Sequence, residues 1–97
     1  MTSRAVIVTG GAQGIGRAAC LAFARDAAAV AVADLDAEHG QVVVEEITRM
    51  GGTAAFVSTD VSDEEQVRAL VDVVTQRWGK LDVLVNNADV STASAWA

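Results

Sequence analysis

The stretch Arg4–Ala19, which reads RAVIVTGGAQGIGRAA, joins an apolar run to a glycine cluster and then to a helical pattern. The run Ala5–Val8 is short, continuous and rich in β-branched residues, which is typical of a strand buried on both faces of a parallel sheet. Because glycine has no Cβ, the turn after it lets backbone N–H groups come close to a phosphate. The helix expected from about Gly14 to Asp26 would place its partly positive amino end beside that anion. The glycines of this turn are Gly10, Gly11, Gly14 and Gly16.

The spacing of these glycines is more specific than their number. Gly14–Ala19 matches the pattern G-x-G-x-x-A, and Thr9–Gly16 matches the wider pattern T-G-x-x-x-G-x-G. A carboxylate follows at Asp34, after the second apolar run 28–33, where a dinucleotide-binding unit places the acid that holds the adenosine ribose. The combination predicts nucleotide binding. The alternative is a purely structural turn, with Asp34 acting as a turn or cap carboxylate.

Further along the chain, helical and strand patterns continue to alternate. The first helix is expected to bury a face of small residues, Ile15, Ala18, Ala19 and Ala22. A second helix, capped by Asp36 and stopped by Gly51, would bury Val43, Val44, Ile47 and Met50. After a strand at 53–57, the run 62–65 (SDEE) predicts a capping box with Ser62 as the cap, and the amphipathic helix behind it would bury Val67, Leu70, Val71, Val74 and Trp78.

Gly79 ends that third helix, and Leu81–Val85 makes a fourth strand. The order β-α-β-α-β-α-β predicts an α/β fold, a partial Rossmann-like doubly wound sheet of about four parallel strands in the order 3-2-1-4 with three helices. Ligands of such sheets bind beyond the carboxyl ends of the strands, where the glycine turn, Asp34, Asp60 and 86–88 would meet. We expect residues 1–89 to form this half-domain and 90–97 an irregular tail.

Composition excludes several classes of function. The chain of 97 residues has 7 basic and 13 acidic residues and no basic cluster, so binding to nucleic acid or to an anionic membrane through charge is not expected. The single cysteine, Cys20, is interpreted as a small buried side chain, and His39 as a surface residue rather than a metal ligand. No export signal opens the chain, which favours a cytoplasmic location.

Three segments together resemble the short-chain dehydrogenase/reductase family: Thr9–Gly16 (TGGAQGIG), Asp60–Val61 and Leu84–Ala88 (LVNNA). The resemblance covers the amino-terminal half of that family and implies hydride transfer between a nicotinamide cofactor and an alcohol or carbonyl carbon. It also implies roles for single residues. Asp60 and Val61 would hold the adenine edge, and Asn87 and Ala88 would line the adenosine ribose and the path to the nicotinamide. The pyrophosphate would be wrapped by Gly10, Gln13, Gly14, Ile15 and Gly16.

The charge of Asp34 bears on the choice of cofactor. A carboxylate can accept hydrogen bonds from both ribose hydroxyls, whereas a 2′-phosphate at this position would meet like charge. Leu35 and Asp36 bring no compensating base, so we expect NAD rather than NADP. Arg17 is the one residue that favours NADP, because its guanidinium lies one turn into the helix and could reach a phosphate. The alternative is that Arg17 is an ordinary solvated helix residue.

Two features depart from the family pattern. The family transfers its proton through a tyrosine assisted by a lysine four residues on, but this chain has no tyrosine, and its one lysine, Lys80, stands at a turn. Asp89 occupies a position where the family has glycine, so its side chain and negative charge are expected to weaken cofactor binding. We assign no catalytic residue, and expect a truncated chain that binds a dinucleotide but is weakly stable and catalytically incomplete. The substrate is not indicated.

The second function class is a non-catalytic nucleotide-binding or interaction module that a partner chain completes. Two helices would cover one face of the predicted sheet and only one helix the other, and Leu81–Val85 would be an apolar edge strand. An uncovered face and edge favour self-association or docking with a partner.

Overall fold

The computed structural model describes residues 4–87, in which strands and helices alternate along the chain. The elements are β1 (Ala5–Thr9), α1 (Gly14–Arg25), β2 (Ala29–Asp34), α2 (Ala37–Arg49), β3 (Thr53–Ser58), α3 (Glu64–Trp78) and β4 (Val83–Asn86). Ala88, Asp89 and the predicted tail 90–97 lie outside the described residues.

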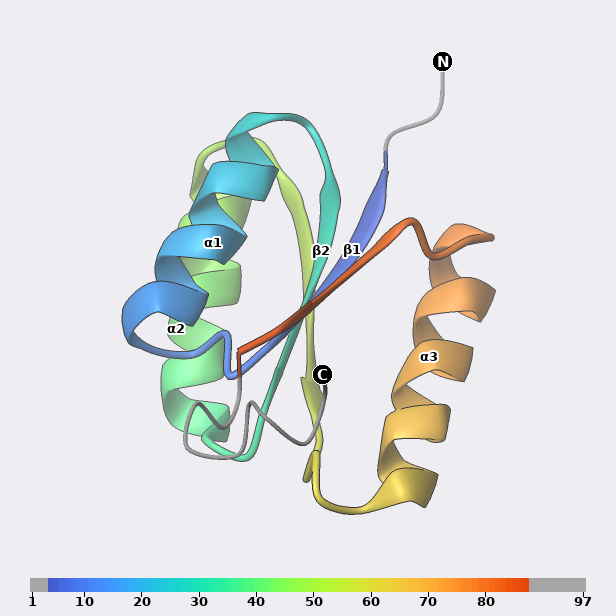
Figure 1. Ribbon diagram of the computed structural model, residues 1–97. Coiled ribbons are helices and arrows are strands. Elements are labelled where there is room, and N and C mark those ends of the chain that lie inside the picture. Colours follow the sequence, from blue (N-terminus) through green and yellow to red (C-terminus); the bar gives the residue numbers. More distant parts are fainter. Residues whose placement is uncertain (1–3, 88–97) are drawn as a thin grey trace.

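The four strands form one parallel sheet in the order β3-β2-β1-β4, which confirms the predicted fold class and strand order. The register places Val8 of β1 beside Val32 of β2 on one side and Val85 of β4 on the other. All strands therefore run the same way, and their carboxyl ends meet at one edge of the sheet (Figure 1).

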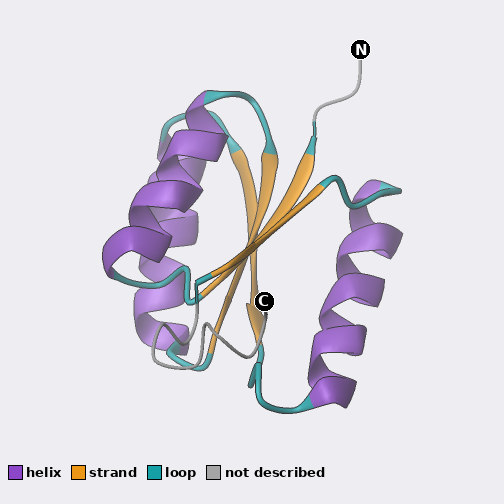
Figure 2. Ribbon diagram, in the orientation of Figure 1, coloured by secondary structure: helices purple, strands orange, loops and turns teal. Residues whose placement is uncertain are grey.

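Helices cover the two faces of this sheet unequally. Figure 2 shows α1 and α2 on one side of the strands and α3 alone on the other, as predicted. Alternate residues of β1 enter the two cores: Val6 and Val8 pack under α1 and α2, while Ala5 and Ile7 pack under α3. Each of these side chains is at most 1% exposed, which explains why the run is apolar without interruption.

The predicted buried face of α1 is wrong. Ile15 is 78% exposed, and Ala18 and Ala22 also face solvent, while Ala19 is half-buried. The buried residues are instead Gly16, Cys20 and Ala24, which follow one another at intervals of four. The physical reason is the contact at Gly16, where an added Cβ would lie 1.9 Å from the Gly10 carbonyl oxygen. This contact between helix and turn sets the rotation of α1, and it places Cys20 in the core as expected.

Helix α2 agrees with the sequence patterns at its start but not at its end. Its N-cap is Asp36, whose carboxylate accepts a hydrogen bond from the His39 N–H at 3.1 Å. Val43 and Ile47 are buried and Val44 half-buried, as expected. Met50 is 44% exposed, because it lies at the C-cap, past the last turn that packs on the sheet.

The start of α3 is displaced by one residue from the prediction. Asp63, not Ser62, is the N-cap and accepts from the N–H groups of Glu65 and Gln66. Ser62 donates instead to the Asp60 carboxylate. The predicted buried face is confirmed: Leu70 and Val74 are buried, and Val67, Val71 and Trp78 are half-buried.

Strand β4 is an edge of the described sheet, and it begins at Val83 rather than at Leu81. Asp82 precedes it and joins it to β1: its N–H donates to the Ala5 carbonyl at 2.9 Å and its carboxylate accepts from the Ala5 N–H at 2.8 Å. Leu84 is 49% exposed. The predicted apolar edge is thus present in the described part of the chain.

Candidate functional site

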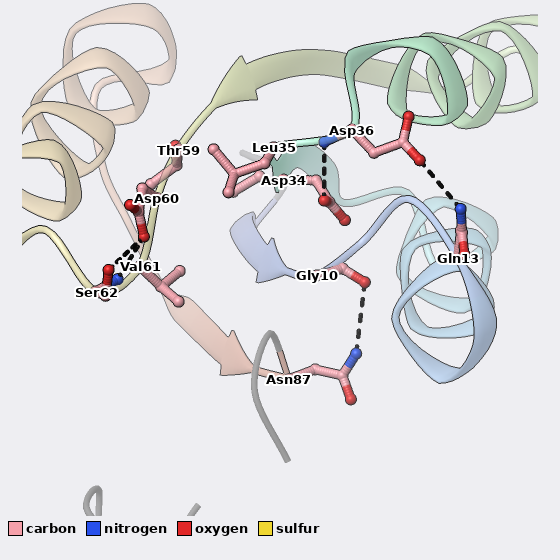
Figure 3. Close-up of a pocket in the computed structure, with 11 residues that line it drawn as sticks. Gly10, Gln13, Asp34, Leu35, Asp36, Thr59, Asp60, Val61, Ser62 and Asn87 are labelled. Atoms are coloured by element: carbon pink, nitrogen blue, oxygen red, sulfur yellow. Dashed lines mark hydrogen bonds between the residues drawn. The ribbon is translucent and has the colours of Figure 1, made fainter. Parts of the chain in front are cut away.

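A cavity of about 570 Å³ lies at the carboxyl ends of the strands, where the loops leaving β1, β2, β3 and β4 meet. Its size is in the range of small-molecule and cofactor sites. Figure 3 shows the side chains that border it. The lining residues are Gly10, Gln13, Ala33, Asp34, Leu35, Asp36, Thr59, Asp60, Val61, Ser62 and Asn87.

The glycine turn contributes the backbone of Gly10 and the residue Gln13 to this cavity. Gly10 has φ +66° and donates its N–H to the Ala33 carbonyl at 2.8 Å, which continues the pairing of β1 with β2 beyond the strand. Gly14 has φ +58°, a conformation that L-residues with a side chain rarely adopt. Gly16 lies under the turn against the Gly10 carbonyl. The turn therefore depends on glycine for both its conformation and its packing.

The amino end of α1 has no side chain that caps it. Its N-cap is Gln13, which makes no capping hydrogen bond, and its first turn contains no acidic residue. The Gln13 side chain donates instead to the Asp36 carboxylate at 3.1 Å. The first N–H groups of a helix have no intrahelical partner and carry partial positive charge. This helix start is therefore suited to an anionic ligand.

Asp34 lies at the end of β2 and joins two loops. One carboxylate oxygen accepts from the Ala12 N–H at 3.1 Å, and the other accepts from the Asp36 N–H at 3.0 Å. The carboxylate thus has the structural role that the sequence left as an alternative. Two oxygens can together accept about four hydrogen bonds, so capacity remains for ligand hydroxyls.

The loop after β3 supplies a second carboxylate, Asp60. One of its oxygens accepts from the Ser62 hydroxyl at 2.6 Å and from the Ser62 N–H at 2.9 Å, and these bonds lower the pKa of Asp60. The Asp60 N–H donates to the Gln66 side-chain oxygen at 2.8 Å. This loop is therefore held in place by its own hydrogen bonds, and the half-buried Val61 adds apolar surface to the cavity.

Thr9 attaches the end of β4 to the end of β1. Its side chain is 4% exposed, and its hydroxyl donates toward the Asn86 side-chain oxygen at 3.1 Å and accepts from the Asn87 N–H at 2.9 Å. The Asn87 amide in turn donates to the Gly10 carbonyl at 3.5 Å. These bonds hold Asn87 at the cavity, next to the glycine turn.

The structure brings together six of the ten residues expected to form the site. These six line the cavity: Gly10, Gln13, Asp34, Asp60, Val61 and Asn87. Gly14, Ile15 and Gly16 do not line it, since Gly16 is buried below the turn and Ile15 faces solvent. Ala88 lies outside the described residues.

Five lining residues were not expected to form the site. Four of the five directly precede or follow a residue that was, and Asp36 lies two residues after Asp34, so closeness in the chain to Asp34, Asp60 and Val61 was the signal that could have identified them. They are Ala33, Leu35, Asp36, Thr59 and Ser62.

Three carboxylates, Asp34, Asp36 and Asp60, line the cavity, and no lysine or arginine is among its described lining residues. Arg17, the nearby base that could have met a phosphate, is paired with Glu46 of α2 through its Nε at 3.0 Å and also through a terminal nitrogen. The hydrogen bond and the charge of Glu46 raise the pKa of Arg17. The side-chain charge around the cavity is therefore negative.

The described residues contain neither a group of His, Cys, Asp or Glu that could hold a metal ion nor a helix long and apolar enough to cross a membrane. His39 is exposed, as expected, and contacts Asp36 through Nδ1 at 2.6 Å. The cytoplasmic location stays a prediction.

Comparison with known proteins identifies the family. The sequence model described as short chain dehydrogenase matches residues 4–96. The chain belongs to the short-chain dehydrogenase family. It is 45% identical over 91 residues to an uncharacterised oxidoreductase of Methylorubrum extorquens, and 40% identical over 92 residues to a cyclopentanol dehydrogenase of Comamonas. These matches cover 93% and 95% of this chain, which spans 37% of the length of each relative.

Solved structures of short-chain dehydrogenases have the same fold. A 7α-hydroxysteroid dehydrogenase in complex with NADH and 7-oxo glycochenodeoxycholic acid superposes with a TM-score of 0.85 at 37% identity. That match covers 89% of this chain and 34% of the other. The chain corresponds to one part of such a protein, consistent with the predicted resemblance to the amino-terminal portion of the family.

Proposed function

We propose that this chain is the NAD-binding part of a short-chain oxidoreductase, whose whole protein transfers a hydride between a nicotinamide cofactor and an alcohol or carbonyl substrate. The observation that carries the proposal is the cavity itself, which is lined both by Gln13, the N-cap residue of the uncapped helix α1, and by Asp34. The family and the NADH-bound relative support the same class of ligand.

The residues present fit a dinucleotide. Its diphosphate would lie against the first turn of α1, where no side chain caps the helix N–H groups. Asp34 would accept hydrogen bonds from the adenosine ribose, as the acid after the second strand does in dinucleotide-binding units. Leu35 and Val61 offer apolar surface for the adenine, with Asp60 near its edge. Asn87 and Ala88 would continue the site toward the nicotinamide.

The negative charge around the cavity favours NAD over NADP. The 2′-phosphate of NADP would enter a space lined by carboxylates and would find no lysine or arginine among its described lining residues. Arg17 is occupied by Glu46 on the outer surface of α1 and α2. The bound cofactor would supply the hydride chemistry. This chain's own contribution is to bind and orient it, because the chain has no tyrosine to move the substrate's proton.

Calorimetric titration with NAD and with NADP tests the proposal. We expect the folded chain to bind NAD. The variant Asp34→Asn should bind NAD about tenfold more weakly, because charge-assisted hydrogen bonds to the ribose are lost. The same variant should show a smaller preference for NAD over NADP. Asp72→Asn, which removes an equal charge from an exposed position on α3, should leave both affinities unchanged. A folded chain that binds neither cofactor would contradict the proposal.

The second candidate is a binding module that another chain completes. The half-exposed Leu84 on the edge strand β4 favours it, as does the coverage of one sheet face by α3 alone. Sedimentation velocity over a range of concentrations tests whether the other chain is a second copy of this one, and a monomer at every concentration would exclude self-association. Turnover by the purified chain would exclude a purely non-catalytic role.

A further inference from the structure

The segment that leaves β3 carries two residues of the cavity wall, Asp60 and Val61, and is tied to the start of α3. One tie comes from Gln66, which does not line the cavity and lies six positions after Asp60. We infer that Gln66 is a positioning residue for the adenine end of the cofactor site, because its amide fixes the main chain of Asp60. This inference rests on the proposed function and extends it.

The main chain of Asp60 is held at both of its polar groups. Its N–H donates to Oε1 of Gln66 at 2.8 Å, and its carbonyl accepts from the Asp63 N–H at 3.0 Å. The second bond only closes the turn over 60–63. The first bond joins that turn to the body of α3, whose Leu70 and Val74 are buried against the sheet.

The Gln66 amide departs from the usual role of its position. In a capping box, the side chain three residues after the N-cap reaches back to the N–H of the N-cap residue, which here is Asp63. Oε1 of Gln66 instead accepts from Asp60, while Nε2 donates to Asp63 Oδ2 at 3.2 Å. Both ends of the amide are therefore used, one as acceptor and one as donor. Neither a carboxylate nor an apolar side chain can make both bonds.

The segment that Gln66 holds also directs the Asp60 carboxylate. Oδ1 accepts from the hydroxyl and the N–H of Ser62 (Figure 3), and none of the described residues 4–87 donates to Oδ2. The bonds from Ser62, that of the hydroxyl first, lower the pKa of Asp60. An ionised carboxylate accepts hydrogen bonds and donates none. It therefore suits the exocyclic amino group of adenine and repels the carbonyl oxygen that hypoxanthine has in its place, so selection between these bases reports where the carboxylate lies.

Calorimetric titration of the whole 97-residue chain with NAD and with nicotinamide hypoxanthine dinucleotide tests the inference. We expect the unmodified chain to bind NAD more tightly than the hypoxanthine analogue. Gln66→Met keeps a side chain of similar length but removes both hydrogen bonds of the amide. NAD should bind this variant roughly threefold to tenfold more weakly, and the analogue within about twofold, because only adenine donates to Asp60. The preference for NAD should shrink accordingly.

Gln76→Met is the matched control, since Gln76 is an exposed residue of the same helix and does not line the cavity. It should leave the preference for NAD unchanged.

A second pair of variants carries the test if Gln66→Met does not fold. Gln66→Glu alone should reduce the preference for NAD, because the new carboxylate faces that of Asp63. The double variant Asp63→Asn/Gln66→Glu exchanges donor and acceptor at constant net charge, and asparagine caps helices about as well as aspartate. It should restore most of the preference.

Three results would overturn the inference and leave the proposed function standing. The first is an unmodified chain that binds both dinucleotides equally well. The second is a folded Gln66 variant in which the ratio of the two dissociation constants is unchanged, since a merely structural role does not alter the choice of base. The third is a double variant no more selective than Gln66→Glu. Absence of NAD binding to the unmodified chain would overturn both.

Discussion

The first helix differs from the other two at both of its ends. At their starts, α2 and α3 are capped by Asp36 and Asp63 and carry acidic residues in their first turns. At the start of α1, Gln13 makes no capping bond and no acid follows. All three helices face the same physical problem, which is a row of N–H groups without intrahelical partners. The helices α2 and α3 satisfy these groups with carboxylates of their own first turns, whereas α1, which begins at the glycine turn, has no such carboxylate.

The carboxyl ends of the three helices also differ, and α1 is again the exception. The chain leaves α2 through Gly51 at φ +84° and α3 through Gly79 at φ +78°, whereas it leaves α1 through Ala27 at φ +64°. A positive φ is easy for glycine and costs an alanine about 1–2 kcal/mol. Helices α2 and α3 are thus locally optimised at both ends, while α1 is held in place by its contacts with the turn and the sheet.

The largest effect is expected where α1 touches the turn. In Gly16→Ala, the new Cβ would lie 1.9 Å from the Gly10 carbonyl oxygen, so helix and turn must separate. We expect a loss of about 3 kcal/mol in the free energy of unfolding, measured by urea denaturation, with NAD binding lost. Gly14→Ala is the control: it has open space around the Cβ and only a strained φ of +58°, so it should cost less, about 1–2 kcal/mol. Equal losses in the two variants would show that the contact at Gly16 is not decisive.

An intermediate effect is expected from removing a cap. Asp63→Ala removes the acceptor for the Glu65 and Gln66 N–H groups and should lower the free energy of unfolding by about 1 kcal/mol. Gln13→Ala, at the equivalent position of α1, should cost less than about 0.5 kcal/mol, because this side chain caps nothing. Thermal melts of both variants measure the difference. A Gln13 variant as unstable as the Asp63 variant would remove the contrast between the helix starts.

The smallest effect is a gain in stability. Ala27→Gly relieves the positive φ after α1 and should stabilise the chain by about 0.5–1 kcal/mol, after allowance for the greater freedom of glycine in the unfolded state. For a domain of this size, that corresponds to a rise in melting temperature of about 2–8 °C. Ala22→Gly, at an exposed position within α1, is the control and should lower the melting temperature. A fall in both variants would show that Ala27 is not strained.

Local patterns predicted the elements well and their orientation less well. The uninterrupted apolar run of β1 predicted a central buried strand, and the offsets of three and four in α3 predicted its buried face, because strands and helices have fixed periods. The face of α1 was predicted wrongly, since its many alanines give no clear stripe. The α3 cap was predicted at Ser62, but it is Asp63; both residue types cap helices, and only the fold shows that Ser62 donates to Asp60.

Some residues of the candidate site could be predicted from the sequence and others could not. Gly10, Asp34 and Asn87 could be found because each belongs to a motif at a fixed distance from a strand, and the parallel sheet brings strand ends together. Asp36 could not be found as a cavity residue, because its sequence context describes a helix cap equally well. The direction of its carboxylate depends on Gln13, which lies 23 positions away in the chain.

The amino-acid sequence by itself determined the alternation of elements, the parallel sheet and the family, because these depend on periodicity and on glycines at particular positions. The tertiary structure alone decided which face of α1 is buried, which loops share a cavity and which charges face it. These depend on contacts between residues far apart in the chain, such as Gly16 with Gly10, Arg17 with Glu46, and Gln13 with Asp36. Local patterns carry no information about such contacts until the sheet has assembled.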